Sequence, residues 1–211
     1  YDPDILYSSS QYGGLKISYD AGNNWNNFKP VSYDGAWVTP YKMHPLDNNF
    51  VVAGYREVYR TTTGGAFWDS ISNNITGQTD IRTIALAPSD KDVIYAATYS
   101  RIQVTFDGGI SWANIKTGLP SSTISDVTVS ANDPNWVFVT FSNYTAGNKV
   151  YESTNGGSTW SNISGSNLPN LPINCIVFQD LANDDLYIGT DVGVYHKDNS
   201  MSDWQPFMTS L

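Results

Sequence analysis

Short apolar runs alternate with polar turns along the whole chain, and residues 81–120 show the pattern clearly. Four runs rich in β-branched and aromatic residues follow one another there: IRTIALA, DVIYAATY, RIQVTF and SWANIK. Turn residues such as Pro-Ser-Asp and Asp-Gly-Gly separate these runs, and no segment has the period of an amphipathic helix. The pattern predicts four short antiparallel strands in this stretch.

The same order of strands and turns recurs along the chain at nearly constant spacing. Each copy closes on a tryptophan, and successive tryptophans are 43, 44, 48 and 44 residues apart: Trp25, Trp68, Trp112, Trp160 and Trp204. Four strands per unit at this period are typical of a β-propeller blade. We therefore expect an all-β fold, a single propeller segment over residues 1–211. Its five units are predicted at about 1–30, 31–76, 77–120, 121–168 and 169–211.

The first unit begins at the second strand of the pattern. Its residues YDPDILYSSSQ match NDPNWVFVTFS of the fourth unit, while DWQPFMTSL at the other end completes a fourth strand. About 19 strands are therefore predicted, three in the first unit and four in each of the others. Because no spare end strand completes the first blade, we expect a fragment of a larger propeller.

The turn before each tryptophan has a recurring composition with a physical reason. An aspartate such as Asp20 or Asp107 accepts hydrogen bonds from main-chain N–H groups of its own turn. Glycine supplies a positive φ, and the tryptophan is expected to bury its ring against the blade. Thr63 replaces the acid in the second copy and Met201 replaces the glycine in the fifth, where we expect a looser turn. The residues assigned a structural role are Asp20, Gly22, Trp25, Gly65, Trp68, Asp107, Gly109, Trp112, Asn155, Gly157, Trp160 and Trp204.

The pattern Ser/Thr-x-Asp-x-Gly-x-Ser/Thr-Trp resembles the Asp-box, or bacterial neuraminidase repeat. This motif occurs in propellers of sialidases, sortilin-type receptors, family 74 xyloglucanases and photosystem assembly factors, and the resemblance covers nearly all of the chain. It implies a structural role for the motif. The phrasing LPNLPINCIVFQ also resembles propeller regions of large secreted proteins of Bacteroidota exported by the type IX system, which implies an extracellular or cell-surface location.

Composition and charge limit the classes of molecule that the chain is expected to bind. Hydrophobic residues make up 40% of the chain and charged residues 15%, which is typical of an ordered protein. The net charge of −9, without a Lys/Arg stripe, argues against nucleic acid, and no apolar run approaches a membrane span, so we expect no membrane insertion. The single cysteine, Cys175, allows no internal disulfide and is expected to be a small buried hydrophobe.

One segment resembles a known catalytic sequence. YIGTDVGVY resembles the Thr-Asp-Ile-Gly segment of family 74 xyloglucanases, and the match makes Asp191 a candidate catalytic carboxylate. A glycosidase needs a second carboxylate about 5 to 10 Å away, which in that family comes from a second propeller. The alternative is that Asp-Val-Gly serves the turn alone. A sialidase is not supported, because no Arg-Ile-Pro motif accompanies the four arginines. We expect no metal site and no cofactor, because aspartates such as Asp184 and Asp185 lie in turns without cation-loop spacing.

The loops between second and third strands, and between blades, carry aromatic and polar residues that we expect to be exposed. Such side chains suit stacking on sugar rings or gripping a protein loop; alternatively, the rings pack between blades. The chain is thus predicted to be a non-catalytic binding or adhesion module for a polysaccharide or protein, within its own larger polypeptide; the alternative is part of a family 74-like glycoside hydrolase. The ligand-binding candidates are Tyr12, Trp37, Tyr55, Tyr99, Arg101 and Tyr144.

Overall fold

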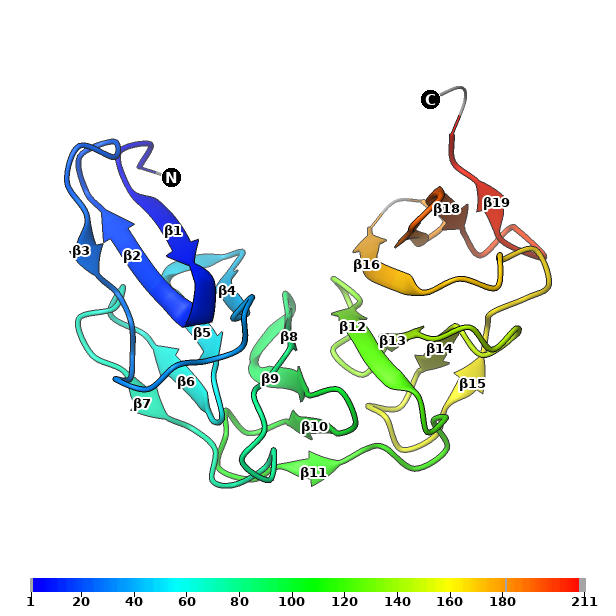
Figure 1. Ribbon diagram of the computed structural model, residues 1–211, viewed down its shortest axis with the longest axis horizontal. Coiled ribbons are helices and arrows are strands. Elements are labelled where there is room, and N and C mark those ends of the chain that lie inside the picture. Colours follow the sequence, from blue (N-terminus) through cyan, green and yellow to red (C-terminus); the bar gives the residue numbers. More distant parts are fainter. Residues whose placement is uncertain (1, 181, 209–211) are drawn as a thin grey trace. The chain divides into compact units, whose positions relative to one another are not determined.

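The computed structural model describes residues 2–180 and 182–208. Within these residues the chain forms nineteen strands and one 3-10 turn, with no α-helix (Figure 1). The strands make five antiparallel sheets, each a meander in sequence order, of which the first has three strands and the others four. The predicted all-β fold, the four strands per unit and the three-stranded first unit are confirmed. Residues 209–211 of the predicted last strand lie outside the described residues.

The chain divides into two compact units, Tyr1–Arg82 and Thr83–Leu211. The first unit contains two sheets. Its first sheet consists of β1 (Leu6–Ser10), β2 (Gly14–Ser18) and β3 (Asn26–Asn27), with the 3-10 turn η1 (Gln11–Gly13) between β1 and β2. Its second sheet consists of β4 (Tyr41–His44), β5 (Asp47–Gly54), β6 (Val58–Thr61) and β7 (Asp69–Ser70).

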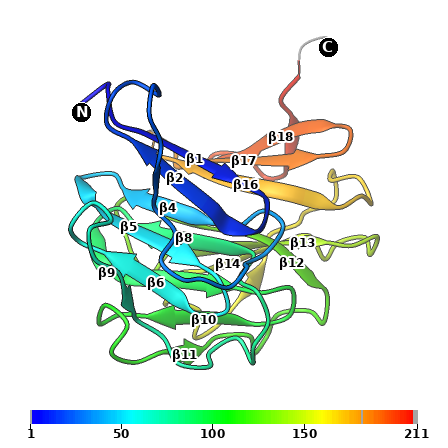
Figure 2. The same cartoon turned by 60° about the vertical axis from the view of Figure 1, so that its left-hand side comes forward.

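The second unit contains the other three sheets (Figure 2). The third sheet is β8 (Thr83–Ala87), β9 (Asp90–Ala97), β10 (Ile102–Thr105) and β11 (Ala113–Asn114). The fourth is β12 (Thr123–Val129), β13 (Val137–Ser142), β14 (Val150–Ser153) and β15 (Ser161–Asn162). The fifth is β16 (Ile173–Gln179), β17 (Asp185–Thr190), β18 (Gly193–Lys197) and β19 (Gln205–Pro206).

Apolar side chains bury between neighbouring sheets within each unit. In the first unit, Leu15 and Ile17 of β2 pack with Val51 and Ala53 of β5 and with Tyr55, which follows β5. In the second unit, one cluster joins the third and fourth sheets and another joins the fourth and fifth. Since successive strand residues point to opposite faces, both faces of the fourth sheet are buried, as its continuous run VFVTF predicts.

The fourth strand of each four-stranded sheet is only two residues long. In the third sheet, β11 pairs through Ala113 and Asn114 alone, although the sequence pattern extends over SWANIK. The tight turn before β11 occupies the start of that run, so fewer residues remain for the ladder.

Cys175 is exposed, and the prediction that it is buried was wrong. Strand β16 has a register irregularity between Ile173 and Cys175, beyond which Ile176 points to the core and Val177 to the open face. Cys175 and Val177 thus lie exposed, with Val177 at 55%. Among the described residues, no helix is long and apolar enough to cross a membrane.

Candidate functional site

The Asp-box turns are closed by side-chain hydrogen bonds. In the third repeat, the Thr105 hydroxyl accepts the Gly109 N–H at 2.8 Å and donates to Asp107 at 2.7 Å. Asp107 also accepts the Ser111 N–H at 2.8 Å and the Ser111 hydroxyl at 2.6 Å. These bonds, led by the one from the Ser111 side chain, lower the pKa of Asp107 to about 2. The hydroxyl and carboxylate groups of this motif therefore form hydrogen bonds within the turn.

The same geometry persists where the acid is replaced. Asn155 in the fourth repeat accepts the Thr159 N–H at 2.9 Å and the Ser153 hydroxyl at 2.9 Å. In the second repeat the Thr63 hydroxyl accepts the Phe67 N–H at 3.0 Å. The turn requires an acceptor at this position, and a negative charge is not needed.

The glycine position of the motif excludes a Cβ atom for two reasons. Gly157 has a φ of +88°, a left-handed conformation that other residues rarely adopt. A Cβ built on it would lie 2.5 Å from Cδ1 of Ile115 in the preceding sheet. Gly22, Gly65 and Gly109 have the same positive φ, at +91°, +93° and +96°.

Each motif tryptophan reaches back to the preceding repeat where both sheets lie in one unit. The indole N–H of Trp160 donates to the Ile115 carbonyl, and that of Trp204 donates to the Ile163 carbonyl, both at 2.8 Å. In the first unit the Trp68 ring contacts Phe28 edge-on at 5.1 Å. Sequence reasoning missed this connection, although a signal exists. An apolar residue follows every motif tryptophan at the third position: Phe28, Ile71, Ile115, Ile163 and Phe207.

Burial of these tryptophans differs from the prediction. Trp204 is fully buried although its motif is the least complete, and Trp68, Trp112 and Trp160 are partly buried. Trp25 is 41% exposed, so the expectation that its ring is buried against the blade was wrong. The reason is that burial of this ring comes from the preceding sheet rather than from its own.

The fifth turn is built differently from the others. Met201 stands at the glycine position, and its N–H donates to the Asp198 carbonyl at 3.2 Å. In the first repeat, the equivalent bond runs from the N–H of Asn23, the residue after the motif glycine, to the carbonyl of Asp20. The main-chain bond of the fifth turn is therefore shifted by one residue towards the N-terminus. The Lys197 ammonium donates to the Met201 carbonyl at 2.5 Å and stands where the other repeats have Ser or Thr. The turn thus lacks the Ser or Thr hydroxyl and the glycine of the other four.

Two predicted ligand-binding residues lie together in the first unit. Tyr12 and Trp37 are 48% and 56% exposed, and their rings meet edge-to-face with centroids 5.2 Å apart. The Tyr12 N–H donates to the Trp37 carbonyl at 3.2 Å, and the Tyr12 carbonyl accepts the Gly35 N–H at 3.1 Å. Two loops distant in sequence are thereby fixed side by side.

An open hollow of about 410 Å³ adjoins this pair. It is lined by Ser9, Ser10, Gln11, Trp37, Val38 and Thr39, none of which is charged. The Val38 side chain is 68% exposed. The surface therefore combines aromatic and aliphatic area with neutral hydrogen-bonding groups.

Tyr55 has a different place from the one predicted. It is fully buried, so it cannot contact a ligand, and its assignment as a binding residue was wrong. Its hydroxyl donates to the Gly13 carbonyl at 2.6 Å, directly beside Tyr12. A Cβ on Gly13 would lie 2.6 Å from the Tyr55 ring. Tyr55 therefore packs beneath the Tyr12 loop on its buried side. The burial of Tyr55 raises the pKa of its hydroxyl.

The remaining candidates lie in the second unit. Tyr99 and Arg101 share the β9–β10 loop, where Tyr99 is 50% exposed, and Tyr144 in the β13–β14 loop is 68% exposed. Asp191 is exposed in the β17–β18 loop and accepts a hydrogen bond from Asn174 at 2.8 Å. Within the described part of the chain, a cluster of three metal-ligating side chains lies at the other end of that hairpin.

Comparisons with known proteins agree with this architecture. The family model for Sortilin-Vps10, described as sortilin, neurotensin receptor 3, matches residues 56–168. The xyloglucanase Xgh74A of Acetivibrio thermocellus is 22% identical over 97% of this chain, which spans 29% of that enzyme's length.

Similar solved structures include the GH74 enzyme of Niastella koreensis, with a TM-score of 0.72 and 17% identity over 96% of this chain and 35% of that one. The nidogen/laminin complex gives a TM-score of 0.66 and 15% identity over 95% of this chain and 76% of the matched one. YCF48 bound to D1 peptide gives a TM-score of 0.62 and 16% identity over 97% of this chain and 65% of the matched one. These likenesses show the fold, a β-propeller of four-stranded antiparallel blades that contain Asp-box hairpins.

Proposed function

The chain belongs to the Sortilin-Vps10 family, and from that premise we propose that it is a non-catalytic binding module of a secreted or cell-surface protein. The observation that supports this proposal is the exposed Tyr12–Trp37 pair on its fixed loops. Solved propellers of the same fold include one bound to a peptide and one in a protein complex. A surface location agrees with the resemblance to exported propeller proteins.

The Tyr12 loop is held in a costly conformation, which argues for a role. Tyr12 has a φ of +61°, a region that costs a residue with a side chain about 1–3 kcal/mol. The two main-chain hydrogen bonds and the Tyr55 hydroxyl hold it there. A ring fixed before binding loses little conformational entropy when the ligand arrives. The strain therefore keeps an aromatic surface ready for contact.

The lining of the hollow favours a neutral polysaccharide as the ligand. Sugar rings stack on aromatic faces, and the exposed hydroxyls of Ser9 and Ser10 offer neutral donors and acceptors for sugar hydroxyl groups. A charged ligand would find no ion-pair partner among these lining residues. The named activity of the Acetivibrio thermocellus relative agrees with a β-glucan such as xyloglucan.

The test is binding of xyloglucan and mixed-linkage β-glucan by affinity electrophoresis and titration calorimetry. Trp37→Ala and Tyr12→Gly, which keeps the positive φ, should each weaken binding about tenfold or more, while Tyr99→Ala in the other unit should not. Circular dichroism checks folding. Equal affinity of wild type and both variants would refute the proposed site, and binding of a protein but no glycan would replace the ligand class.

The second candidate function is hydrolysis through Asp191. The exposed carboxylate in the Thr-Asp-Val-Gly segment and the xyloglucanase relative favour it. One carboxylate is insufficient for glycoside hydrolysis, so a partner group would have to come from elsewhere. We expect β-glucan binding without cleavage by wild type and by Asp191→Ala alike. Cleavage by wild type that vanishes in Asp191→Ala would establish the hydrolase instead.

We also propose that the module packs against further repeats of its own polypeptide. Trp25 is 41% exposed and Phe207 is 58% exposed, at motif positions that elsewhere donate and accept the indole–carbonyl bond between sheets. Acrylamide should quench Trp25 fluorescence in the isolated module but not in the full-length polypeptide, with Trp25→Phe identifying its contribution. Equal quenching in both would argue against such packing.

A further inference from the structure

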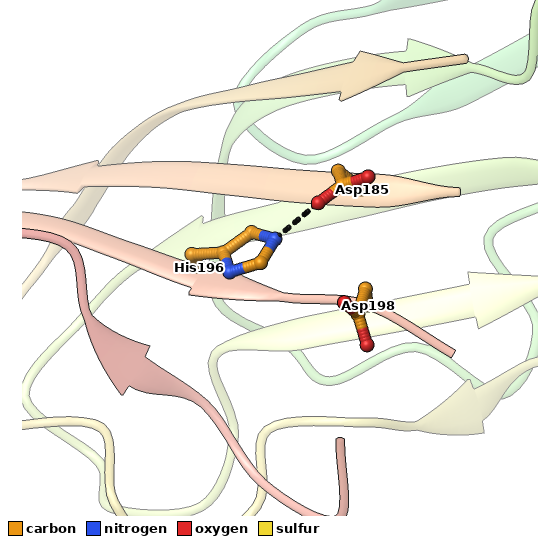
Figure 3. A group of neighbouring side chains, drawn as sticks. All are labelled: Asp185, His196 and Asp198. Atoms are coloured by element: carbon orange, nitrogen blue, oxygen red, sulfur yellow. Dashed lines mark hydrogen bonds and ion pairs between the residues drawn. The ribbon is translucent and has the colours of Figure 1, made fainter. Parts of the chain in front are cut away.

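Three side chains of metal-binding type lie together at the open end of the β17–β18 hairpin. Asp185 begins β17, His196 lies near the end of β18, and Asp198 follows two residues later (Figure 3). One ligand atom from each lies within 4.8 Å of the other two. The Nε2 atom of His196 is 2.5 Å from Oδ1 of Asp185. Two carboxylates and one imidazole therefore converge on a small volume.

The fifth repeat differs from its neighbour at these positions. In the fourth sheet, the matching cross-strand positions hold Trp136 and Glu152, and the Trp136 indole donates to Glu152 at 2.6 Å. Thr154 stands at the position of Asp198. A neutral hydrogen-bond donor and a single carboxylate are thus replaced by a set of three possible metal ligands.

The cluster is shielded and negatively charged. The side chains of Asp185 and His196 are each 12% exposed. The Ser200 hydroxyl and N–H both donate to Asp198, at 2.6 and 2.7 Å. The Lys197 ammonium is engaged by the Met201 carbonyl. Two carboxylates held close together in a poorly hydrated place favour a bound cation.

We propose that Asp185, His196 and Asp198 bind one Zn²⁺ ion, with water completing its coordination. Two carboxylate oxygens and an imidazole nitrogen suit zinc, which binds such atoms at about 2.0–2.2 Å, better than calcium, which prefers oxygen alone. The His196–Asp185 contact has to open slightly, because two ligands of one zinc ion lie about 3 Å apart. The hydrogen bonds from Ser200 orient the Asp198 carboxylate, as partners of metal ligands commonly do.

The ion has a structural role in this proposal. At the Ser/Thr and glycine positions of the motif, the fifth turn has Lys197 and Met201, while Asn199 stands at the acceptor position. An ion held by Asp185, His196 and Asp198 ties strands β17 and β18 to the residue that opens the turn. Zinc thus adds a connection in the repeat whose Asp-box hydrogen bonds are incomplete.

Chelator-treated, tag-free protein is titrated with ZnCl₂ by calorimetry and by thermal unfolding. We expect one site per chain, and a rise in Tm of about 5–10 °C at zinc about a hundredfold above Kd. His196→Gln and Asp198→Asn should each weaken binding about tenfold or more and abolish the rise. If His196→Gln does not fold, Asp198→Asn in its more open position carries the test.

Two matched controls accompany these variants. Asp191→Asn makes the same charge change at the far end of the hairpin, and Cys175→Ser removes the exposed thiol, the other strong zinc ligand. Both should bind zinc as wild type does. The proposal is overturned if wild type binds no zinc, if His196→Gln and Asp198→Asn bind as tightly as wild type, if Cys175→Ser abolishes binding, or if Ca²⁺ produces the same stabilisation as Zn²⁺.

Discussion

Replacing Trp204 by alanine should destabilise the protein far more than the same change at Trp25, although both tryptophans close an Asp-box motif. Trp204 is fully buried and its indole N–H bonds the Ile163 carbonyl, whereas Trp25 is 41% exposed. Removing a large buried aromatic side chain costs about 3–5 kcal/mol of unfolding free energy. Surface substitutions usually change it by about 0.5 kcal/mol, so Trp25→Ala should cost about 1 kcal/mol or less.

The hydrogen bond can be separated from the packing. Trp204→Phe keeps an aromatic ring but leaves the Ile163 carbonyl without its donor, a loss of about 1–3 kcal/mol. Urea unfolding followed by far-ultraviolet circular dichroism measures all three variants without relying on tryptophan fluorescence. Equal losses for Trp204→Ala and Trp25→Ala would refute the reasoning, because the structure attributes the difference to the preceding sheet.

Two further predictions concern the turns. The depressed pKa of Asp107, about 2, means that its carboxylate adds stability above its unfolded pKa of about 3.8 and loses it as the pH falls towards 2. Asp107→Asn should flatten the pH dependence of Tm over that window while keeping the turn, as Asn155 does; an unchanged profile would contradict this. Gly157→Ala should cost about 1–3 kcal/mol, because its Cβ would meet Ile115 at 2.5 Å, whereas Gly147→Ala, also at positive φ but with nothing within 4 Å, should cost less. Equal urea midpoints for the two alanine variants would show that the close contact does not matter.

Much of the fold could be predicted from the sequence because its signals are local. Runs of β-branched and aromatic residues mark the strands, and the Asp-box composition marks the turn, so the strand order and the three-stranded first unit followed from the residues of each repeat alone. The positive φ at Gly109 followed in the same way, since no neighbouring sheet is needed to explain it.

What the sequence could not show depends on contacts between repeats. Tyr12 and Tyr55 both lie in loops and look alike in sequence, yet one is exposed and the other lies buried beneath the loop of the first. Trp25 and Trp204 differ in burial because of the sheet before them, not their own motif. Cys175 became exposed through a register irregularity in β16 that no residue type announces.

The indole–carbonyl bond has a consequence for how such a chain can lengthen. In the fourth and fifth repeats, the motif tryptophan donates to the preceding repeat, and the acceptor there lies three residues after that repeat's own tryptophan. The N–H of that acceptor residue is bound within its own sheet, as it is for Ile115 and Ile163, so only its carbonyl faces the neighbour. Because donor and acceptor lie in one short stretch of sequence, a copied repeat of this kind carries both halves of the bond with it. Gene duplication can therefore add such a repeat without a compensating change in its neighbours.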